Sequence, residues 1–360
     1  MSAKAVIAMS GGVDSSVAAL LMKMRGCTCM GATMKLFHNE DIGLCREHTC
    51  CSLEDVEDAR SVAYALGMPY YVFNFSDRFR RDVIDRFVAA YEIGVTPNPC
   101  IDCNRYLKFD KLFQRMAELE YDWIVTGHYA RTEYDAKSGR YLLKRAVDGN
   151  KDQSYVLWTM TQAQLAHVRF PLGGMRKAEV RALAEAHGLI NAGKHDSQDI
   201  CFVQNGSYAD FIEQYTGKTY PPGDFVDMAG RVLGRHRGVI HYTVGQRRGL
   251  GLAMEEPMYV QSIDPAANTV TLCAERELYT RRLTAGDINL IAVPELCGAM
   301  RVQAKVRYRQ PAQWATATQT APGRFMLEFD EPQRAVTRGQ SAVLYDGDLV
   351  IGGGIIESTE

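Results

Sequence analysis

The chain has 360 residues, 46% of them hydrophobic and 23% charged, with a formal net charge of −2 at pH 7. This length predicts two or three domains rather than a single core. The near-neutral balance excludes a protein that coats nucleic acid non-specifically, although it permits a local basic patch. No apolar stretch approaches the roughly 18 residues that a membrane span needs. The chain enters a predicted strand by Ala5 without a signal segment, so we expect a cytoplasmic protein with no membrane contact.

The first predicted strand, residues 4–9, runs into Ser-Gly-Gly-Val-Asp-Ser-Ser at residues 10–16. Two glycines let main-chain N–H groups turn toward one point, and the helical spacing that follows places that point at a helix N-terminus. Serine hydroxyls add donors, and Asp14 is unusual in a bare phosphate site unless it holds a magnesium ion. An ordinary helix cap uses the same residue types. The coincidence of all of them behind a strand nevertheless favours a phosphate site.

This loop lacks the Gly-Lys-Ser/Thr ending of a Walker A motif. It resembles the PP-loop of the ATP pyrophosphatases, which cleave ATP between the α- and β-phosphates to adenylate a substrate oxygen. The loop alone does not say which member of that superfamily the chain is like.

The first 130 residues alternate between strand and helix patterns, which predicts a doubly wound parallel sheet. The predicted strands are 4–9, 29–36, 70–75 and 122–126, and the predicted helices are 14–25, 52–66, 78–91 and 108–119. Ligands of such sheets bind beyond the carboxyl ends of the strands. Residues 10–16, 34–35 and 126–128 all fall at such ends.

A hairpin is predicted at 131–143 and a helix near 176–187, and the character of the chain changes after about residue 205. Beyond Pro221-Pro222-Gly223, short alternating runs at 259–263, 269–273, 302–308, 324–329 and 342–345 predict small β domains. We therefore expect an α/β nucleotide-binding domain over 1–205, a small mainly-β domain over 206–280, and a C-terminal β-barrel over 281–360.

Ten cysteines are present, and seven of them precede residue 110. In a cytoplasmic protein they are expected to be mostly thiols. Thr96–Asn104 carries Cys100 and Cys103 ahead of a predicted helix, where a thiol has a lowered pKa. Lys194–Phe202 carries a single Cys201 at the end of a polar loop. For either segment alone, a buried thiol or half of a metal site is an equally good interpretation, and Cys45, Cys50 and Cys51 are interpreted as a loop cluster.

Together these segments resemble the bacterial tRNA-specific 2-thiouridylases, which replace the C2 oxygen of the wobble uridine with sulfur. The resemblance spans nearly the whole chain and is carried by residues 10–16, 96–104, 126–131, 148–155, 196–202, 242–251 and 307–310. The segments 148–155 and 242–251 separate this family from other PP-loop enzymes, although no physical role follows from their sequences alone.

The resemblance implies a role for each matching residue. Cys103 would be the catalytic nucleophile and Cys201 the carrier of a persulfide. ATP, with Mg²⁺ on Asp14, would be held by Ala8, Met9, Ser10, Gly11, Gly12, Val13, Asp14, Ser15, Met34 and Gly127. Asn98, Pro99 and Cys100 would lie against the target base, and tRNA would be contacted by His128, Lys151, Asp152, Gln153, Arg307, Tyr308 and Gln340. A cysteine desulfurase or a sulfur-relay protein is the implied sulfur donor.

A persulfide route, in two versions, and an iron–sulfur cluster route are compatible with these residues. A Cys201 persulfide could attack the adenylated uridine directly, or Cys103 could first release hydrosulfide, leaving a disulfide that reductants reset. In well-known members the residue three before the nucleophile is an Asp, proposed as its base, whereas here it is Cys100. Asp102 adjoins Cys103, but neighbouring side chains diverge, so it is a poor replacement. Cys100, Cys103 and Cys201 could instead hold a [4Fe–4S] cluster with one open iron.

Two basic runs without acidic residues, 231–248 and 301–310, suggest phosphate contacts, although a solvated basic face would look the same. The alternatives to a thiouridylase are another PP-loop ligase, which needs no paired cysteines, and a non-catalytic tRNA-binding protein. A thiol oxidoreductase built on Cys100 and Cys103 leaves the loop at 10–16 unexplained.

Overall fold

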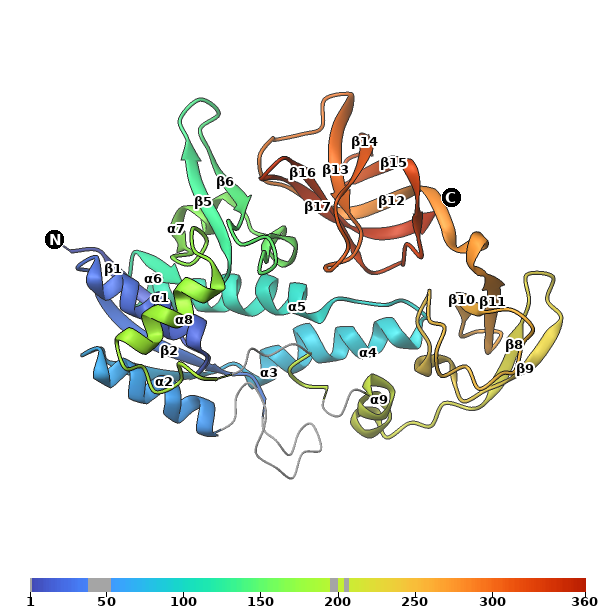
Figure 1. Ribbon diagram of the computed structural model, residues 1–360, viewed down its shortest axis with the longest axis horizontal. Helices are drawn as coiled ribbons and strands as arrows, with labels where there is room; N and C mark the ends of the chain where they lie inside the picture. Colours follow the sequence, from blue (N-terminus) through green and yellow to red (C-terminus); the bar gives the residue numbers. More distant parts are fainter. Residues whose placement is uncertain (1, 38–52, 195–199, 204–206) are drawn as a thin grey trace.

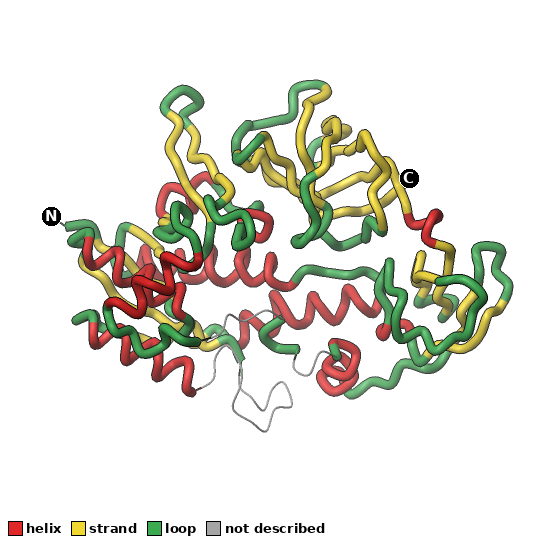
Figure 2. The backbone as a smooth tube through the Cα atoms, viewed as in Figure 1, coloured by secondary structure: helices red, strands yellow, loops and turns green. Residues whose placement is uncertain are grey.

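The structure is a computed structural model that describes residues 2–37, 53–194, 200–203 and 207–360. Figures 1 and 2 show an α/β part at the N-terminal end, a small sheet at the opposite end, and a β-barrel between them above two long helices. The predicted fold class, a parallel α/β domain followed by small β domains that end in a barrel, is confirmed. Cys45, Cys50 and Cys51 lie outside the described residues.

The N-terminal sheet has five strands in the order β3-β2-β1-β4-β7, and every pairing in it is parallel. The strands are β1 (Lys4–Ala8), β2 (Thr28–Lys35), β3 (Tyr70–Asn74), β4 (Trp123–Val125) and β7 (Val168–Arg169). Successive β1 side chains point to opposite faces. Ala5 and Ile7 pack in one buried cluster with α1 (Val13–Met24), α2 (Leu53–Ala65) and α8 (Lys177–Ala186), whereas Val6 packs in another.

Two long helical stretches lie between β3 and β4 in the chain. The first joins α3 (Ser76–Phe79), η2 (Arg80–Ile84) and α4 (Asp85–Glu92), and the second joins α5 (Pro99–Asp102), η3 (Cys103–Lys111) and α6 (Leu112–Glu118). The predicted start of the second helix near 108 is wrong, because the helix begins at Pro99. Asn98 is its N-cap and accepts a hydrogen bond from the Cys100 N–H at 3.2 Å. Proline is favoured at the first helical position, so the Asn98–Pro99 pair begins a helix rather than preventing one.

The hairpin of β5 (Ala130–Asp135) and β6 (Arg140–Arg145) is confirmed, and η4 (Ser154–Leu157) and α7 (Gln162–His167) follow it. After α9 (Tyr208–Thr216), a four-stranded sheet has the order β10-β11-β8-β9. Its strands are β8 (Gly223–Val226), β9 (Val232–His236), β10 (Met258–Asp264) and β11 (Thr269–Ala274), with the short helices η5 (Val239–His241) and η6 (Glu275–Leu278).

The last six strands close into a barrel, because β12 pairs with both β15 and β17. They are β12 (Tyr279–Leu290), β13 (Ala299–Lys305), β14 (Gln313–Ala321), β15 (Arg324–Arg334), β16 (Ser341–Asp346) and β17 (Leu349–Thr359). The β5–β6 hairpin continues this sheet through one pairing, Leu349 with Lys144. The sequence did not predict that attachment.

The barrel is packed firmly on the N-terminal part. Barrel residues Val343 and Tyr345 share a buried cluster with Phe109 and Trp158. The Trp158 indole N–H donates to the Ser341 hydroxyl at 3.0 Å, and the Tyr155 hydroxyl donates to the Ser341 carbonyl at 2.9 Å. A shared core with satisfied polar groups fixes the two parts relative to each other.

Among the residues that the structure describes, no helix combines the length and the apolar character that crossing a membrane requires.

Candidate active site

The loop between β1 and α1 is held by its own hydrogen bonds. The Ser15 and Ser16 hydroxyls both donate to the Gly12 carbonyl, at 2.9 and 3.1 Å, and the Ser10 N–H donates to the Ser15 hydroxyl at 3.2 Å. Gly11 has φ +75°, and a β-carbon there would overlap the Asp55 backbone. The two buried hydroxyls therefore shape the loop instead of facing a ligand, which leaves the first-turn N–H groups of α1 as the anion donors.

The predicted ATP residues converge on this loop from three neighbouring strands. Met9 follows β1, its N–H donates to the Ala32 carbonyl of β2, and Met34 lies near the carboxyl end of β2. Gly127 follows β4, and a β-carbon on it would lie 2.7 Å from the Ser15 nitrogen and 3.0 Å from the Asp14 β-carbon. Only a glycine fits this close approach, because a side chain at position 127 would collide with the first turn of α1. The carboxyl end of β4 therefore lies directly against the β1–α1 loop.

Asp14 is engaged by two other side chains. The Lys177 ammonium lies 2.7 and 2.8 Å from its two carboxylate oxygens, and the Tyr129 hydroxyl donates to one of them at 2.8 Å. With a lysine ammonium against both oxygens, this arrangement does not fit a magnesium ion bound directly by Asp14. Lys177 is a functional candidate that the sequence did not reveal, because α8 is far from the loop along the chain.

A second supporting residue that sequence reasoning missed is Asn191. Its side-chain N–H₂ donates to the Gly11 carbonyl at 2.9 Å and to the Ser16 hydroxyl at 2.8 Å, while its buried Oδ1 has no hydrogen-bond partner among the described residues. Lys194 nearby is ion-paired with Asp55 and Asp58 of α2, each at 2.6 Å. Asn191 and Lys194 thus contact the β1–α1 loop and α2 from one short stretch of the chain.

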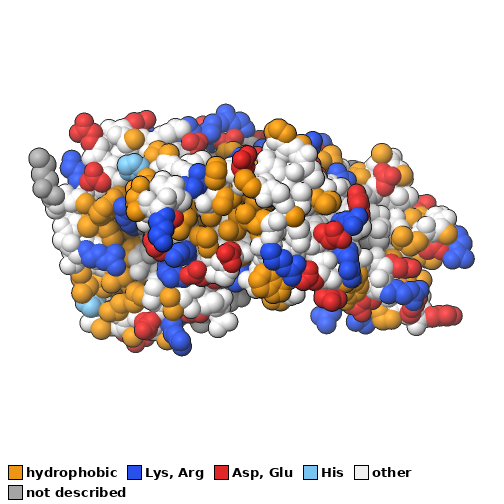
Figure 3. Space-filling model, turned by 90° about the horizontal axis from the view of Figure 1, so that it is seen from above, with side chains coloured by type: hydrophobic (Ala, Val, Ile, Leu, Met, Phe, Trp, Pro, Cys, Tyr) orange, Lys and Arg blue, Asp and Glu red, His pale blue; other side chains and the backbone are white. Residues whose placement is uncertain are grey.

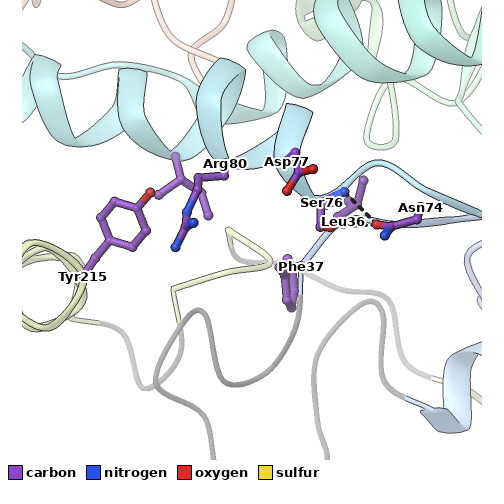
Figure 4. A pocket seen from close by; sticks show the side chains of 8 residues that line it. Leu36, Phe37, Asn74, Ser76, Asp77, Arg80 and Tyr215 are labelled. Atoms are coloured by element: carbon purple, nitrogen blue, oxygen red, sulfur yellow. Dashed lines mark hydrogen bonds between the residues drawn. The ribbon is translucent and has the colours of Figure 1, made fainter.

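A cavity of about 240 Å³ lies beyond the carboxyl ends of β2 and β3 (Figure 4). Leu36, Asn74, Asp77, Arg80 and Tyr215 are among its lining residues, and the Ser76 hydroxyl donates to the Asn74 side chain at 2.7 Å. The cavity adjoins the predicted nucleotide site, since Leu36 follows Met34 by two positions, but it contains none of the predicted ATP residues.

Cys103 and Cys201 border the same buried aromatic cluster. Both are partly exposed, and both pack against a cluster that contains Phe79, Phe87 and Phe202. Phe202 anchors Cys201, because its ring lies edge-on to Phe79 and Phe87 with centroids 5.7 and 5.2 Å away. Cys103 begins the π-helical segment η3, and such segments are frequent at functional sites. Leu36 and Phe37, directly after β2, belong to the same cluster, so one end of it reaches the carboxyl edge of the sheet, while the rest extends into the central domain.

Cys100 is exposed, and the next residue, Ile101, is buried in one cluster with Tyr155 and the barrel residue Val343. The Tyr155 ring lies 5.9 Å from the Tyr308 ring. Within the described residues, which include Cys100, Cys103 and Cys201, no three His, Cys, Asp or Glu side chains are grouped so as to hold a metal ion. The three thiols are not gathered as an iron–sulfur cluster requires.

The Asp102 carboxylate lies 3.7 Å from the Arg86 guanidinium. Burial raises the pKa of Asp102 to about 6, although Arg86 and Arg105 act in the opposite direction. Arg105 is ion-paired with Asp287 of β12, which ties this helix to the barrel.

The segment proposed to meet the target base is held by the barrel. The Gln340 amide donates to the Thr96 carbonyl at 3.0 Å and to the Pro97 carbonyl at 3.2 Å, directly before Asn98. The Thr96 N–H donates to the Arg338 carbonyl at 3.1 Å. Gln340 of the barrel therefore holds the chain directly before residues 98–100 in place.

Several residues that the resemblance places at the tRNA make their contacts within the protein itself. His128 is buried between Phe109 and Phe170, and burial lowers the pKa of its imidazole well below the usual range. The Gln153 side chain accepts from the Tyr129 N–H at 2.9 Å. Asp152 accepts hydrogen bonds from its own loop, and Lys151 beside it is partly exposed.

Arg307 joins the central domain to the barrel through hydrogen bonds. Its guanidinium donates to the Val244 and Ala335 carbonyls at 3.1 and 2.7 Å, and to the Thr337 hydroxyl at 2.7 Å. A β-carbon on Gly245 would lie 2.7 Å from the Ala335 β-carbon. The segment 242–251, whose sequence had no evident physical role, thus forms part of this junction.

The basic runs are partly neutralised by acidic residues that lie outside them in the sequence. Arg231 pairs with Asp227, Arg235 with Asp224, and Arg301 with Asp330. Arg237, Arg247, Arg248 and Arg309 are exposed. On the face drawn in Figure 3, basic and acidic side chains lie interleaved rather than in separate patches.

Matches to known protein families and relatives cover nearly the whole chain. The family models described as tRNA methyl transferase HUP domain, tRNA methyl transferase PRC-barrel domain and aminomethyltransferase beta-barrel domain match residues 3–205, 209–274 and 280–356. The tRNA-specific 2-thiouridylase of Moorella thermoacetica is 52% identical over 98% of this chain and 99% of its own length. Those of Acetivibrio thermocellus and Clostridioides difficile are 50% and 46% identical, over 98% and 100% of this chain and 99% of each relative. The chain belongs to the tRNA-specific 2-thiouridylase family.

Proposed function

We propose that this protein uses ATP to adenylate the C2 oxygen of the wobble uridine in tRNA and then replaces that oxygen with sulfur. The observation that carries the proposal is the position of Cys103 and Cys201. These thiols come from distant segments, yet they border one buried cluster, and that cluster reaches the carboxyl edge of the sheet at Leu36 and Phe37. The names of the relatives at about 50% identity support the same reaction.

ATP would be held by Ala8, Met9, Ser10, Gly11, Gly12, Val13, Asp14, Ser15, Met34 and Gly127. The first-turn N–H groups of α1 would take the phosphates, and Lys177 beside Asp14 would offset the charge of the departing pyrophosphate. Mg²⁺ would enter with the ATP phosphates, where it neutralises their charge. We assign it no protein ligand among the described residues, since Asp14 is already occupied by Lys177.

The target uridine would lie against Asn98, Pro99 and Cys100, which the barrel holds in place through Gln340. To reach an ATP pocket the base must leave its stack, as bases modified by enzymes commonly do. The tRNA itself would be contacted near His128, Lys151, Asp152, Gln153, Arg307, Tyr308 and Gln340, and among these the exposed Tyr308 has the most direct access. A tRNA substrate supports a cytoplasmic location.

For sulfur transfer we propose the persulfide route. The terminal sulfur of a Cys201 persulfide attacks C2, AMP leaves with the former C2 oxygen, and the Cys103 thiolate attacks the inner sulfur. The products are 2-thiouridine and a Cys103–Cys201 disulfide, which a cellular thiol reductant reduces back to two thiols. The persulfide would be loaded by a cysteine desulfurase or a relay protein. Because the three thiols are not gathered, no step is assigned to an iron–sulfur cluster.

Mass spectrometry of wobble nucleosides from cells lacking this protein tests the proposal. In a strain without a second copy, 2-thiouridine at this position should disappear and return when the gene is restored. Retained 2-thiouridine would refute the assignment and favour another PP-loop ligase.

A further inference from the structure

Two cations, Arg145 and Lys305, lie at the seam between the β5–β6 hairpin and the barrel, over the rings of Tyr345 and Tyr155, which belong to one buried cluster. Arg145 ends β6, and Lys305 ends β13. The positive charge of Arg145 is close enough to lower the pKa of the Lys305 ammonium, an effect that adds to the larger one of burial. Two partly buried like charges repel one another, so an anion between or beside them would be stabilising.

Among the described residues, neither cation has an acidic partner at contact distance. Within the part of the chain that the structure describes, no ion pair involves Arg145 or Lys305, and Nε and one terminal nitrogen of Arg145 are buried without a hydrogen-bond acceptor. Asp152 is the nearest acidic influence on Lys305. Its carboxylate is already used by the Ala146 N–H at 3.0 Å and by the Ser154 N–H and hydroxyl at 3.2 and 2.8 Å.

Aromatic rings hold the two cations in place. The Arg145 guanidinium lies 4.0 Å from the centroid of the Tyr345 ring. The Lys305 ammonium lies 5.8 Å from the centroids of both Tyr155 and Tyr308. Ring faces attract cations without neutralising their charge, so the positive potential remains available to an incoming anion.

The cluster adjoins the segment assigned to the target base. Tyr308, one wall of the Lys305 site, is exposed, and its ring lies 5.9 Å from that of Tyr155, which packs in one buried cluster with Ile101, the residue after Cys100. Cys100 in turn stands two residues after Asn98, which the barrel holds through Gln340. A nucleotide placed against Asn98–Cys100 would bring its own backbone to this seam.

We propose that Lys305, supported by the field of Arg145, binds a backbone phosphate of the tRNA next to the target uridine. This inference rests on the proposed function and adds to it the residue that fixes the RNA backbone. A lysine ammonium binds a phosphate as a point charge, so the contact carries no sequence information and positions the substrate.

The test measures tRNA affinity against salt for the wild type, Lys305→Met and Lys144→Met. Lys144 is the matched control, because it lies next to Arg145 but is ion-paired with Glu133 at 2.6 Å. Lys305→Met should weaken binding about tenfold or more and reduce the slope of log affinity against log salt by about 0.7 to 0.9. Lys144→Met should leave both nearly unchanged, and Lys305→Arg should keep most of the slope.

A second arm removes the phosphate charge instead. A methylphosphonate on either side of the wobble uridine should weaken wild-type binding at one of the two positions and have no further effect on Lys305→Met. Equal losses in both proteins at every position would overturn the proposal. An unchanged salt slope in a Lys305→Met protein with a wild-type circular dichroism spectrum would also overturn it. The same is true if Lys305→Met lowers the affinity for pyrophosphate but not the affinity for tRNA. Failure of the proposed function is separate, since then the wild type itself would form no 2-thiouridine.

Discussion

The Lys177 ammonium of α8 lies 2.7 Å from one carboxylate oxygen of Asp14 and 2.8 Å from the other, in the first turn of α1. The Lys177 side chain is only 11% exposed, so the charge is fixed beside the loop. A preorganised cation stabilises a leaving anion without reorganisation at the moment of reaction.

Replacing Lys177 with Met should therefore lower the rate of tRNA-dependent pyrophosphate release by about 10²–10³-fold. Pyrophosphate would be measured in a single-turnover assay with saturating ATP. Lys218→Met, which removes a lysine paired with Glu92 far from the loop, is the control. A Lys177→Met protein that releases pyrophosphate at the wild-type rate would show that the pair only stabilises the fold.

Gln340→Ala should impair thiolation without affecting ATP binding. The substitution removes two hydrogen bonds that hold Thr96 and Pro97 and thereby the Asn98–Cys100 segment. A displacement of about 1 Å at a substrate-positioning segment can cost about 10²-fold in rate, and we expect a loss of about ten- to a hundredfold. Gln319→Ala, which removes a barrel hydrogen bond to the Leu296 N–H, should have no such effect. Equal activity of the two variants would contradict a positioning role.

Arg307→Ala should destabilise the protein as well as weaken tRNA binding. Its guanidinium satisfies two carbonyls and a hydroxyl across the junction of the central domain and the barrel, and buried acceptors left unpaired cost about 1–3 kcal/mol. Urea unfolding and tRNA affinity would be measured together, with the exposed Arg309→Ala as control. A loss of tRNA affinity without any change in the urea midpoint would instead indicate direct contact with RNA.

His128 should make the protein sensitive to acid. Burial holds the pKa of this imidazole well below its value in the unfolded chain, so below pH 6.5 the unfolded state binds more protons than the folded state. Stability should fall as the pH is lowered, by at most about 1.4 kcal/mol per pH unit from this group. His128→Phe should reduce that slope in urea midpoints between pH 5 and 7. An identical pH dependence of the variant would mean that other groups cause the acid sensitivity.

Short-range patterns predicted much of the fold. The β1 strand with its glycine loop, the parallel alternation that follows and the hairpin turn at Gly139 are local features, and the structure confirms them. The start of the second long helix was missed because Pro97 and Pro99 suggested a stiff approach, whereas Asn98 and Pro99 together cap a helix. That signal was present in the sequence and was misinterpreted.

The missed parts of the site depend on contacts between distant segments. Lys177, Asn191 and Gln340 act on residues that precede them by 163, 180 and 244 positions. Nothing near them in sequence marks these contacts, because each depends on how segments far apart in the chain pack together in the folded protein. The pair of Arg301 with Asp330 likewise joins β13 to β15, whereas Asp227 and Asp224 stand only four and eleven residues before the arginines that they pair with, just outside the basic run.

The central claim is that the two thiols, Cys103 and Cys201, carry sulfur to an adenylated uridine. The most direct measurement follows pyrophosphate and 2-thiouridine in one reaction containing tRNA, ATP and a cysteine desulfurase, for the wild type, Cys103→Ser and Cys201→Ser. The account predicts that both variants release pyrophosphate but form no 2-thiouridine, and that the oxidised wild type contains a Cys103–Cys201 disulfide. Full 2-thiouridine formation by either serine variant would contradict it.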